Sequence, residues 1–307
     1  MIAYLLSQQI VVLFLMMGLG VLLVLFGIVK SEDSRVLSLV TIYLISPCVI
    51  IKAFQINYTP AIRDGFLLAL GAALAIHVVL FIVTGLLSRI FHFDAIEKAS
   101  LIYSNSGNLI IPLVTAVLGE EWVIYASAFL CVQLFFVFTH CQSLMKGQTM
   151  LNFKRLFTNI NIIAIFLGII MFVGNMQLPK IPHDAVSAMA ACIGPVSMVL
   201  LGMIMASIDW KAVMTFRRLY LVTLLKMLIV PLIVLVLLKY SGMTSLVANG
   251  KIIILISFLG VITPSATMVT QFAQIYRRDE KYASSINAVT TLVCIATMPL
   301  LIWLYMV

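Results

Sequence analysis

Charged residues are scarce in this sequence: Asp, Glu, Lys and Arg make up only 10% of its 307 residues, whereas 63% are hydrophobic. A soluble globular domain carries about 25% charged residues, so that class is excluded. Long apolar runs fill most of the chain and predict an all-α polytopic membrane protein. The segments between these runs are short, and we expect no separate soluble domain.

Acidic residues are absent from the interior of every apolar run. Intramembrane carboxylates often bind the driving ion or proton of cation-coupled transporters, so coupling here must use other groups. A membrane enzyme that acts on a lipid or isoprenoid diphosphate would need clustered Asp or His residues to hold a metal. The sequence has no such cluster, and we do not expect an enzyme.

The spacing of the cysteines also indicates no functional site. They lie singly in apolar runs, without the spacing of metal ligands: Cys48, Cys131, Cys141, Cys192 and Cys294. Cysteine in such surroundings commonly behaves as a small buried hydrophobe, so we expect no metal, no cofactor and no disulfide. The net charge of +8 comes from basic residues scattered through short loops. Without a basic patch, no binding of nucleic acid is expected.

The apolar runs can be measured against the membrane. A helix needs roughly 20 apolar residues to cross the hydrocarbon core. This length predicts ten spans, at residues 7–29, 36–54, 66–88, 95–118, 122–145, 159–177, 184–206, 219–239, 250–276 and 283–306. The first run continues beyond the length of a cleavable signal peptide, so we expect it to remain in the mature protein.

Lys and Arg predict the orientation. Most of the 19 basic residues fall in the first, third, fifth, seventh and ninth loops. Positive residues are retained on the cytoplasmic side, so both termini are expected on the outer face of the cell membrane.

The two halves of the chain carry matching landmarks in the same order. Ten spans divided after the fifth would enter the membrane from opposite sides, which predicts an inverted repeat of residues 1–150 and 151–307. The landmarks pair as Ser46-Pro47 with Gly194-Pro195, Gly107 to Pro112 with Gly260 to Pro264, and Tyr125-Ala126-Ser127 with Tyr282-Ala283-Ser284.

Proline and glycine interrupt the fourth and ninth spans. Pro112 has no amide hydrogen, so the Asn108 carbonyl loses its helical partner, and Pro264 has the same effect on Gly260. Lipid cannot satisfy exposed backbone groups, so a broken helix must be buried in protein or line a wet cavity. We predict that both helices are broken at these positions and cross near the middle of the membrane.

Polar side chains surround the two predicted breaks. The candidate substrate-binding residues there are Asn105, Ser106, Gly107, Asn108, Pro112, Gly260, Thr263, Pro264, Ser265 and Thr267. Their neutral donors, together with the partial positive charge of two helix N-termini, favour an anion. The alternative is a pair of proline kinks whose polar side chains cap their own backbone.

Four further polar residues lie inside the predicted spans. Lys226 is either a counter-charge for an anion or a lysine that extends its side chain to the membrane surface. His77 is a candidate proton relay, although a lone histidine is often a packing residue. Gln133 and Asn287 lie on helices expected to flank the crossing and are candidates to line the cavity.

These features together resemble the auxin efflux carrier family, in particular its compact prokaryotic members. The resemblance rests on five plus five spans and on three motifs: Asn105-Ser106-Gly107-Asn108 with Pro112, Thr263-Pro264-Ser265-Ala266-Thr267, and Tyr276-Arg277-Arg278-Asp279. It extends over essentially the whole chain, and Asn108, Pro112 and Pro264 match the family's crossing residues.

The resemblance implies a fold similar to bile-acid symporters and sodium/proton antiporters. Spans one, two, six and seven would form a scaffold, and spans three to five and eight to ten a moving bundle with elevator-type alternating access. It also implies a homodimer and a substrate among small organic anions, either auxin-like or malonate- and malate-like carboxylates. The remaining alternative is a membrane sensor or receptor that keeps the carrier fold but does not transport.

Overall fold

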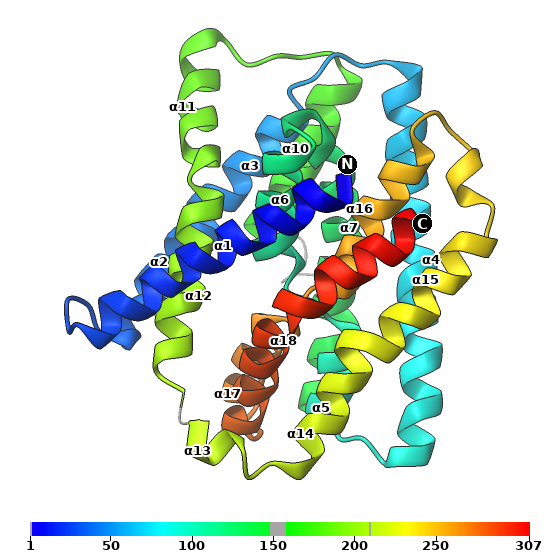
Figure 1. Cartoon of the computed structure of the whole chain (residues 1–307). Coiled ribbons are helices and arrows are strands. Elements are labelled where there is room, and N and C mark those ends of the chain that lie inside the picture. Colours follow the sequence, from blue (N-terminus) through cyan, green and yellow to red (C-terminus); the bar gives the residue numbers. More distant parts are fainter. Residues whose placement is uncertain (1, 148–157, 209) are drawn as a thin grey trace.

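The computed structural model describes residues 2–147, 158–208 and 210–307, and its elements there are helices (Figure 1). Seven helical segments of the described chain are long and apolar enough to cross a membrane. Several of them join two helices through a π-helical turn. The seven are α1 (Ile2–Leu25), α2 (Ser34–Val40) with α3 (Ser46–Ala53), α4 (Pro60–Phe91), α7 (Val123–Phe136) with α8 (Gln142–Lys146), α11 (Lys180–Ala191) with α12 (Ile193–Ala206), α14 (Arg217–Leu224) with α15 (Val230–Tyr240), and α18 (Glu280–Met306).

Shorter helices occupy the remaining predicted spans. The fourth consists of α5 (Ala95–Ile102) and α6 (Ser106–Val117), the sixth contains α10 (Ile160–Val173), and the ninth consists of α16 (Gly250–Ile262) and α17 (Thr267–Ile275). The prediction of an all-helical polytopic membrane protein is thus confirmed. The count of ten spans and the inverted repeat stay predictions.

Local sequence signals set the ends of α4, the longest of these helices. Thr59 accepts a hydrogen bond from the Ile62 amide, and Pro60 follows it at the first helical position. Both are favoured at a helix start, because the hydroxyl caps a free amide and proline has no amide to leave unpaired. The helix ends where His92 takes a left-handed conformation with φ of 54°.

Two sets of helices pack closely. In one set α1 runs along α12, and α3 contacts α10 and α11. A Cβ atom at Gly202 of α12 would collide with the backbone of α1 at Met17, and one at Gly20 of α1 would collide with Val199. Only glycine permits so close an approach, as is common between membrane helices. In the other set α4 packs against α7 and α16, and α17 against α18, while α6 contacts both α1 and α12 of the first set.

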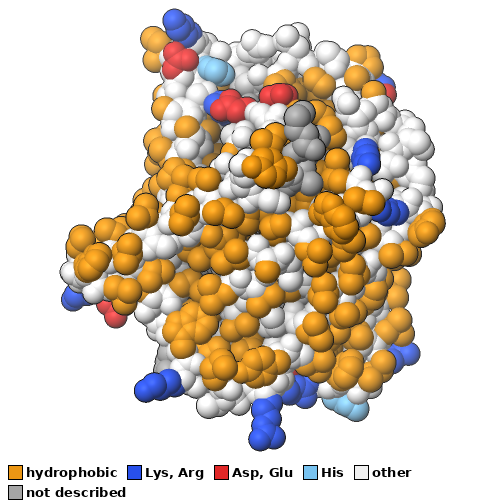
Figure 2. Space-filling view, viewed as in Figure 1, with side chains coloured by type: hydrophobic (Ala, Val, Ile, Leu, Met, Phe, Trp, Pro, Cys, Tyr) orange, Lys and Arg blue, Asp and Glu red, His pale blue; other side chains and the backbone are white. Residues whose placement is uncertain are grey.

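The outer surface is suited to lipid. Figure 2 shows hydrophobic side chains across the middle of the visible face, with Lys and Arg side chains projecting at its lower edge. Large exposed side chains on α1 and α4 include Leu15, Leu19, Leu67 and Ile82. Both termini lie in the upper half of the molecule as drawn in Figure 1.

Candidate functional site

Two interrupted helices meet in the interior of the protein. The chain leaves α5 at Tyr103 and enters α6 at Ser106, and it leaves α16 at Thr263 and enters α17 at Thr267. The two extended segments run antiparallel and form a bridge between Ser104 and Ser265. The Asn105 amide donates to the Pro264 carbonyl at 2.7 Å, and the Ala266 amide donates to the Tyr103 carbonyl at 3.1 Å. Peptide groups released from one helix therefore pair with those released from the other. This pairing allows the two extended segments, residues 103–105 and 263–266, to be buried; we call them the crossing.

The position predicted for the first break is wrong. Asn108 and Pro112 lie inside α6, which continues through Pro112. One proline removes one hydrogen bond, and a helix buried in protein tolerates that loss. The pairing with residues 264–266 fixes the break one turn earlier, at residues 103–105. In the ninth predicted span Pro264 does lie in the break, whereas Gly260 is still within α16 and its carbonyl accepts from the Thr263 hydroxyl.

Helices α6 and α17 both begin at the crossing, so both N-termini lie there. Their N-cap residues are Asn105 and Ala266, and neither makes a side-chain hydrogen bond to the first turn of its helix. An uncapped first turn leaves amide donors without a side-chain acceptor and carries a partial positive charge. In α17 the Val269 amide bonds the Ala266 carbonyl. The crossing thus presents two helix N-termini without a side-chain acceptor in the cap position.

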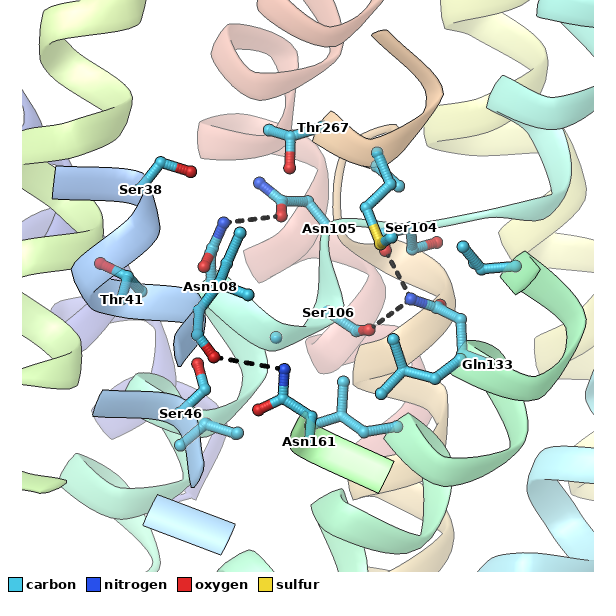
Figure 3. A pocket seen from close by; sticks show the side chains of 18 of the residues that line it. Ser38, Thr41, Ser46, Ser104, Asn105, Ser106, Asn108, Gln133, Asn161 and Thr267 are labelled. Carbon is cyan, nitrogen blue, oxygen red and sulfur yellow. Dashed lines mark hydrogen bonds between the residues drawn. The ribbon is translucent and has the colours of Figure 1, made fainter. Parts of the chain in front are cut away.

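A cavity of about 160 Å³ adjoins these two ends (Figure 3). One wall comes from α2, α3, α12 and the first residues of α10. The other comes from the crossing, α6, α7 and α17. The polar lining residues are Ser38, Thr41, Ser46, Ser104, Asn105, Ser106, Asn108, Gln133, Asn159, Asn161, Thr267 and Gln271. Within the described chain its lining includes no charged side chain.

The amides of this cavity are only partly paired. Asn108 Nδ2 donates to Asn105 Oδ1 at 3.1 Å, and Gln133 Nε2 donates to the Ser104 carbonyl and the Ser106 hydroxyl, each at 2.8 Å (Figure 3). Asn105 Nδ2 and Gln133 Oε1 are buried without a hydrogen-bond partner. Buried polar atoms are rarely left unpaired, since each costs about 1–3 kcal/mol. A ligand that pairs with both atoms must accept a hydrogen bond from Asn105 Nδ2 and donate one to Gln133 Oε1.

The cavity contains only some of the predicted site residues. Asn105, Ser106, Gly107, Asn108, Gln133 and Thr267 line it. The others lie outside its lining: His77, Pro112, Lys226, Gly260, Thr263, Pro264, Ser265 and Asn287. Among the residues described, no three or more His, Cys, Asp or Glu side chains are grouped to hold a metal ion.

Asn287 and Lys226 bond to the crossing without lining the cavity. Asn287 Nδ2 donates to the Ser265 carbonyl, and the Ser265 amide donates to the Thr290 hydroxyl at 3.2 Å. Lys226 Nζ donates to the Leu101 carbonyl at 3.2 Å and to the Ser104 hydroxyl at 2.7 Å. Its side chain is 1% exposed. The ammonium group is therefore held inside the protein, and extension of this lysine to the membrane surface is excluded.

His77 is enclosed by aromatic rings. Its ring lies 5.3 Å from those of Phe129 and Phe136, and Nδ1 lies 2.7 Å from the Ala73 carbonyl. A nitrogen facing a carbonyl carries the hydrogen, which leaves Nε2 buried and unpaired. The proton relay at His77 stays a prediction.

Sequence reasoning missed one wall of the cavity. Ser38, Thr41 and Ser46 come from the second predicted span, and Asn159 and Asn161 from the start of α10. Polar side chains inside an apolar run are a signal in themselves. The interval between Thr41 and Ser46 is one π-helical turn, which the structure forms at Thr41–Ile45. An α-helical repeat does not place these two residues on one face.

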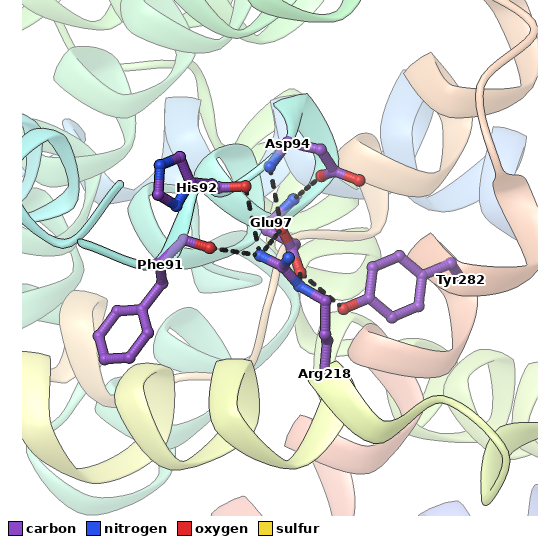
Figure 4. Close-up of polar contacts among 6 residues, drawn as sticks. All are labelled: Phe91, His92, Asp94, Glu97, Arg218 and Tyr282. Atoms are coloured by element: carbon purple, nitrogen blue, oxygen red, sulfur yellow. Dashed lines mark hydrogen bonds and ion pairs between the residues drawn. The ribbon is translucent and has the colours of Figure 1, made fainter. Parts of the chain in front are cut away.

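A second polar cluster lies at the loop end of α5 (Figure 4). The sequence places no acidic residue well inside a predicted span, but the structure buries one in the protein: Glu97 is 1% exposed. Arg218 Nε and Nη2 donate to its two oxygens at 2.7 and 3.0 Å, and the Tyr282 hydroxyl donates at 3.0 Å. Asp94 and Glu97 form a capping box, and burial raises the pKa of the Asp94 carboxyl above its ordinary value.

The comparison with known families agrees with this architecture. A family model described as membrane transport protein matches residues 5–155 and 148–302, which together cover nearly the whole chain. None of the curated proteins compared with the chain matches it. The chain belongs to the membrane transport protein family, the family of the auxin efflux carriers.

Proposed function

We propose that this protein transports small organic anions and binds them in the cavity beside the crossing. The observation that carries the proposal is the pair of uncapped helix N-termini, at α6 and α17, that meet at the cavity. Both ends attract negative charge. The lining offers neutral donors and, within the described residues, no carboxylate that would repel an anion.

The buried amides support a carboxylate as the bound group. Asn105 Nδ2 has no protein partner, and Asn105 is 5% exposed. A carboxylate accepts several hydrogen bonds at once, so it can pair with this amide and with the free amides of the helix ends. On the opposite wall, α12 contributes three apolar side chains, Leu200, Leu201 and Ile204, beside the polar residues of α2 and α3. That wall suits the carbon skeleton of a mono- or dicarboxylate of the auxin-like or malonate- and malate-like type.

We propose an elevator mechanism for the movement. The cavity lies between two packed sets of helices, one containing α1, α3, α10 and α12 and the other containing the crossing, α4, α7 and α18. A bound anion at such a boundary is exposed to one side of the membrane and then to the other when one set slides along its partner. The proposed location is the cell membrane, with both termini on the outer side.

Uptake into proteoliposomes tests the proposed function. Purified protein is reconstituted and offered radiolabelled mono- and dicarboxylates under imposed pH, sodium and potential gradients. We expect uptake of at least one of them above that of protein-free liposomes. Uptake of none under any gradient would contradict the carrier function, and binding without uptake would instead indicate a sensor.

Asn105→Ala tests whether the cavity is the site. Its matched control is Asn57→Ala, because Asn57 is exposed, bonds Gln177, and is not among the residues that line the cavity. We expect the first variant alone to lose uptake. Equal rates in both variants would place the site elsewhere.

A further inference from the structure

Lys226 is a buried charge whose partner is not a carboxylate. Its side chain is 1% exposed, in the π-helical turn Leu225–Ile229 that joins α14 to α15. None of the ion pairs found among the described residues includes it. A buried ammonium is costly unless other groups stabilise its charge. The groups that Nζ contacts therefore indicate the structural role of Lys226.

Those groups belong to the carboxyl end of α5. Leu101 is the second-last residue of this helix, and its carbonyl has no helical donor because the chain becomes extended at Tyr103. Lys226 Nζ donates to it at 3.2 Å. The carboxyl end of a helix also carries a partial negative charge, which a positive group stabilises. The ammonium supplies both the hydrogen bond and the charge.

The second contact of Nζ reaches the crossing itself. Lys226 donates to the Ser104 hydroxyl at 2.7 Å, and Ser104 forms the bridge with Ser265. The next residue is Asn105, whose amide hydrogen bonds Pro264 and whose side chain lines the cavity. We propose that Lys226 is the positioning residue of the crossing: its ammonium fixes the end of α5 and Ser104, and thereby holds Asn105 at the cavity.

The other break shows why a distant charge is needed at only one of the two. At the carboxyl end of α16, the Gly260 carbonyl accepts from the hydroxyl of Thr263, three residues along the same chain. The end of α5 is instead closed by a side chain from another helix. Lys226 thus ties the helix α14–α15 to the crossing. The carboxyl end of α16 is closed locally, and Ser265 is held by the neutral side chains of Asn287 and Thr290.

Amide hydrogen exchange of the purified protein tests this role without any substrate. The amides of Asn105 and Ala266 bridge the crossing. In Lys226→Met we expect both to exchange about tenfold faster or more, because a hydrogen bond to a charged donor is lost. Amides of the α1–α12 contact, as at Gly202, should stay within about twofold. Unchanged exchange at the crossing would overturn the proposal, and so would an equal rise at Gly202.

Ser104→Ala guards against a Lys226 variant that fails to fold. It removes one of the two contacts and should speed exchange at Asn105 by itself. Added to Lys226→Met, it should change exchange by less than about twofold, because the contact is already gone. Additive effects would show that the two residues act separately and would contradict the proposal.

The proposed function gives the transport consequence. Where uptake of a carboxylate is measured, Lys226→Met should raise KM about tenfold through the displaced Asn105. A KM within twofold of the parent value would show that the lysine does not position the site. Because exchange is measured without substrate, failure to find any transported anion leaves the test of the crossing intact.

Discussion

Two buried polar clusters of this protein differ in how completely they are paired. Both oxygens of Glu97 are occupied, one by Arg218 and Tyr282 and the other by Arg218 and the Asp94 amide (Figure 4). The amides of the cavity are neutral, yet Asn105 Nδ2 and Gln133 Oε1 have no partner (Figure 3). The charged cluster is closed and the neutral cluster is open.

This difference indicates that the Glu97 cluster supports the fold, whereas the cavity amides are available to bind a ligand. A carboxylate that is fully hydrogen-bonded fixes the elements around it, here the start of α5 with α14 and α18. The unpaired atoms of the cavity amides form no hydrogen bond in the empty protein and gain a partner only when a ligand enters. Substitution should therefore affect stability in the Glu97 cluster and transport in the cavity.

Asn105→Ala should produce the largest change. Removing the unpaired donor deletes a hydrogen bond to the carboxylate and lowers uptake by about 100-fold or more. The thermal midpoint in detergent should change little, because Nδ2 has no protein partner and the bond lost at Oδ1 comes from Asn108, which is partly exposed and can pair with water instead. Initial uptake rates and thermal unfolding are measured on the same preparation. A large loss of stability with normal uptake per folded molecule would reverse the comparison.

Glu97→Gln should produce the opposite pattern. The neutral amide cannot accept from Arg218 and Tyr282 as the carboxylate does, and we expect the free energy of unfolding to fall by about 2 kcal/mol. The value is modest because Arg218 is half exposed and regains water. Thermal unfolding measures the loss, and uptake per folded molecule should stay near the parent value.

Asp64→Asn is the matched control for the Glu97 variant. Asp64 pairs with Arg63 on the surface, with both side chains about half exposed. Such a pair contributes about 0–1 kcal/mol. A control that destabilised as much as Glu97→Gln would show that burial of the carboxylate is not what matters.

The sequence predicted the open cluster better than the closed one. Polar side chains inside apolar runs marked Asn105, Asn108 and Gln133, because amides are costly in a membrane. Glu97 lies near the end of its run, where an acidic residue is ordinary, so its burial depends on contacts with Arg218 and Tyr282. Such contacts join residues more than 100 positions apart, and periodicity carries no information about them.

The position of the break shows a second limit of the sequence. Proline marks the loss of a hydrogen bond, which predicted an interruption at Pro112. The actual interruption is at residues 103–105, because those residues find backbone partners in residues 264–266. For the same reason Lys226 was predicted to face an anion or the membrane surface. Its partners are Leu101 and Ser104, and these contacts depend on the position of the crossing, which the sequence does not give.

Thr267→Val should have an intermediate effect. Thr267 is the first residue of α17 and lines the cavity beside Asn105 (Figure 3). Valine keeps the shape and removes the hydroxyl, so KM should rise about fivefold with little change in the maximal rate. Thr297→Val is the control, since that hydroxyl bonds its own helix at Val293. Equal KM values for the two variants would remove Thr267 from the site.

Ser38→Ala should have the smallest effect. Ser38 belongs to the wall formed by the second predicted span, opposite the crossing. If the crossing holds the carboxylate, loss of this hydroxyl removes one weak hydrogen bond and raises KM by about twofold. Ser241→Ala is the control, because that hydroxyl bonds Leu238 at the end of its own helix. A rise larger than that of Thr267→Val would mean that the anion is anchored on the opposite wall, and the unpaired amide of Asn105 would then need another explanation.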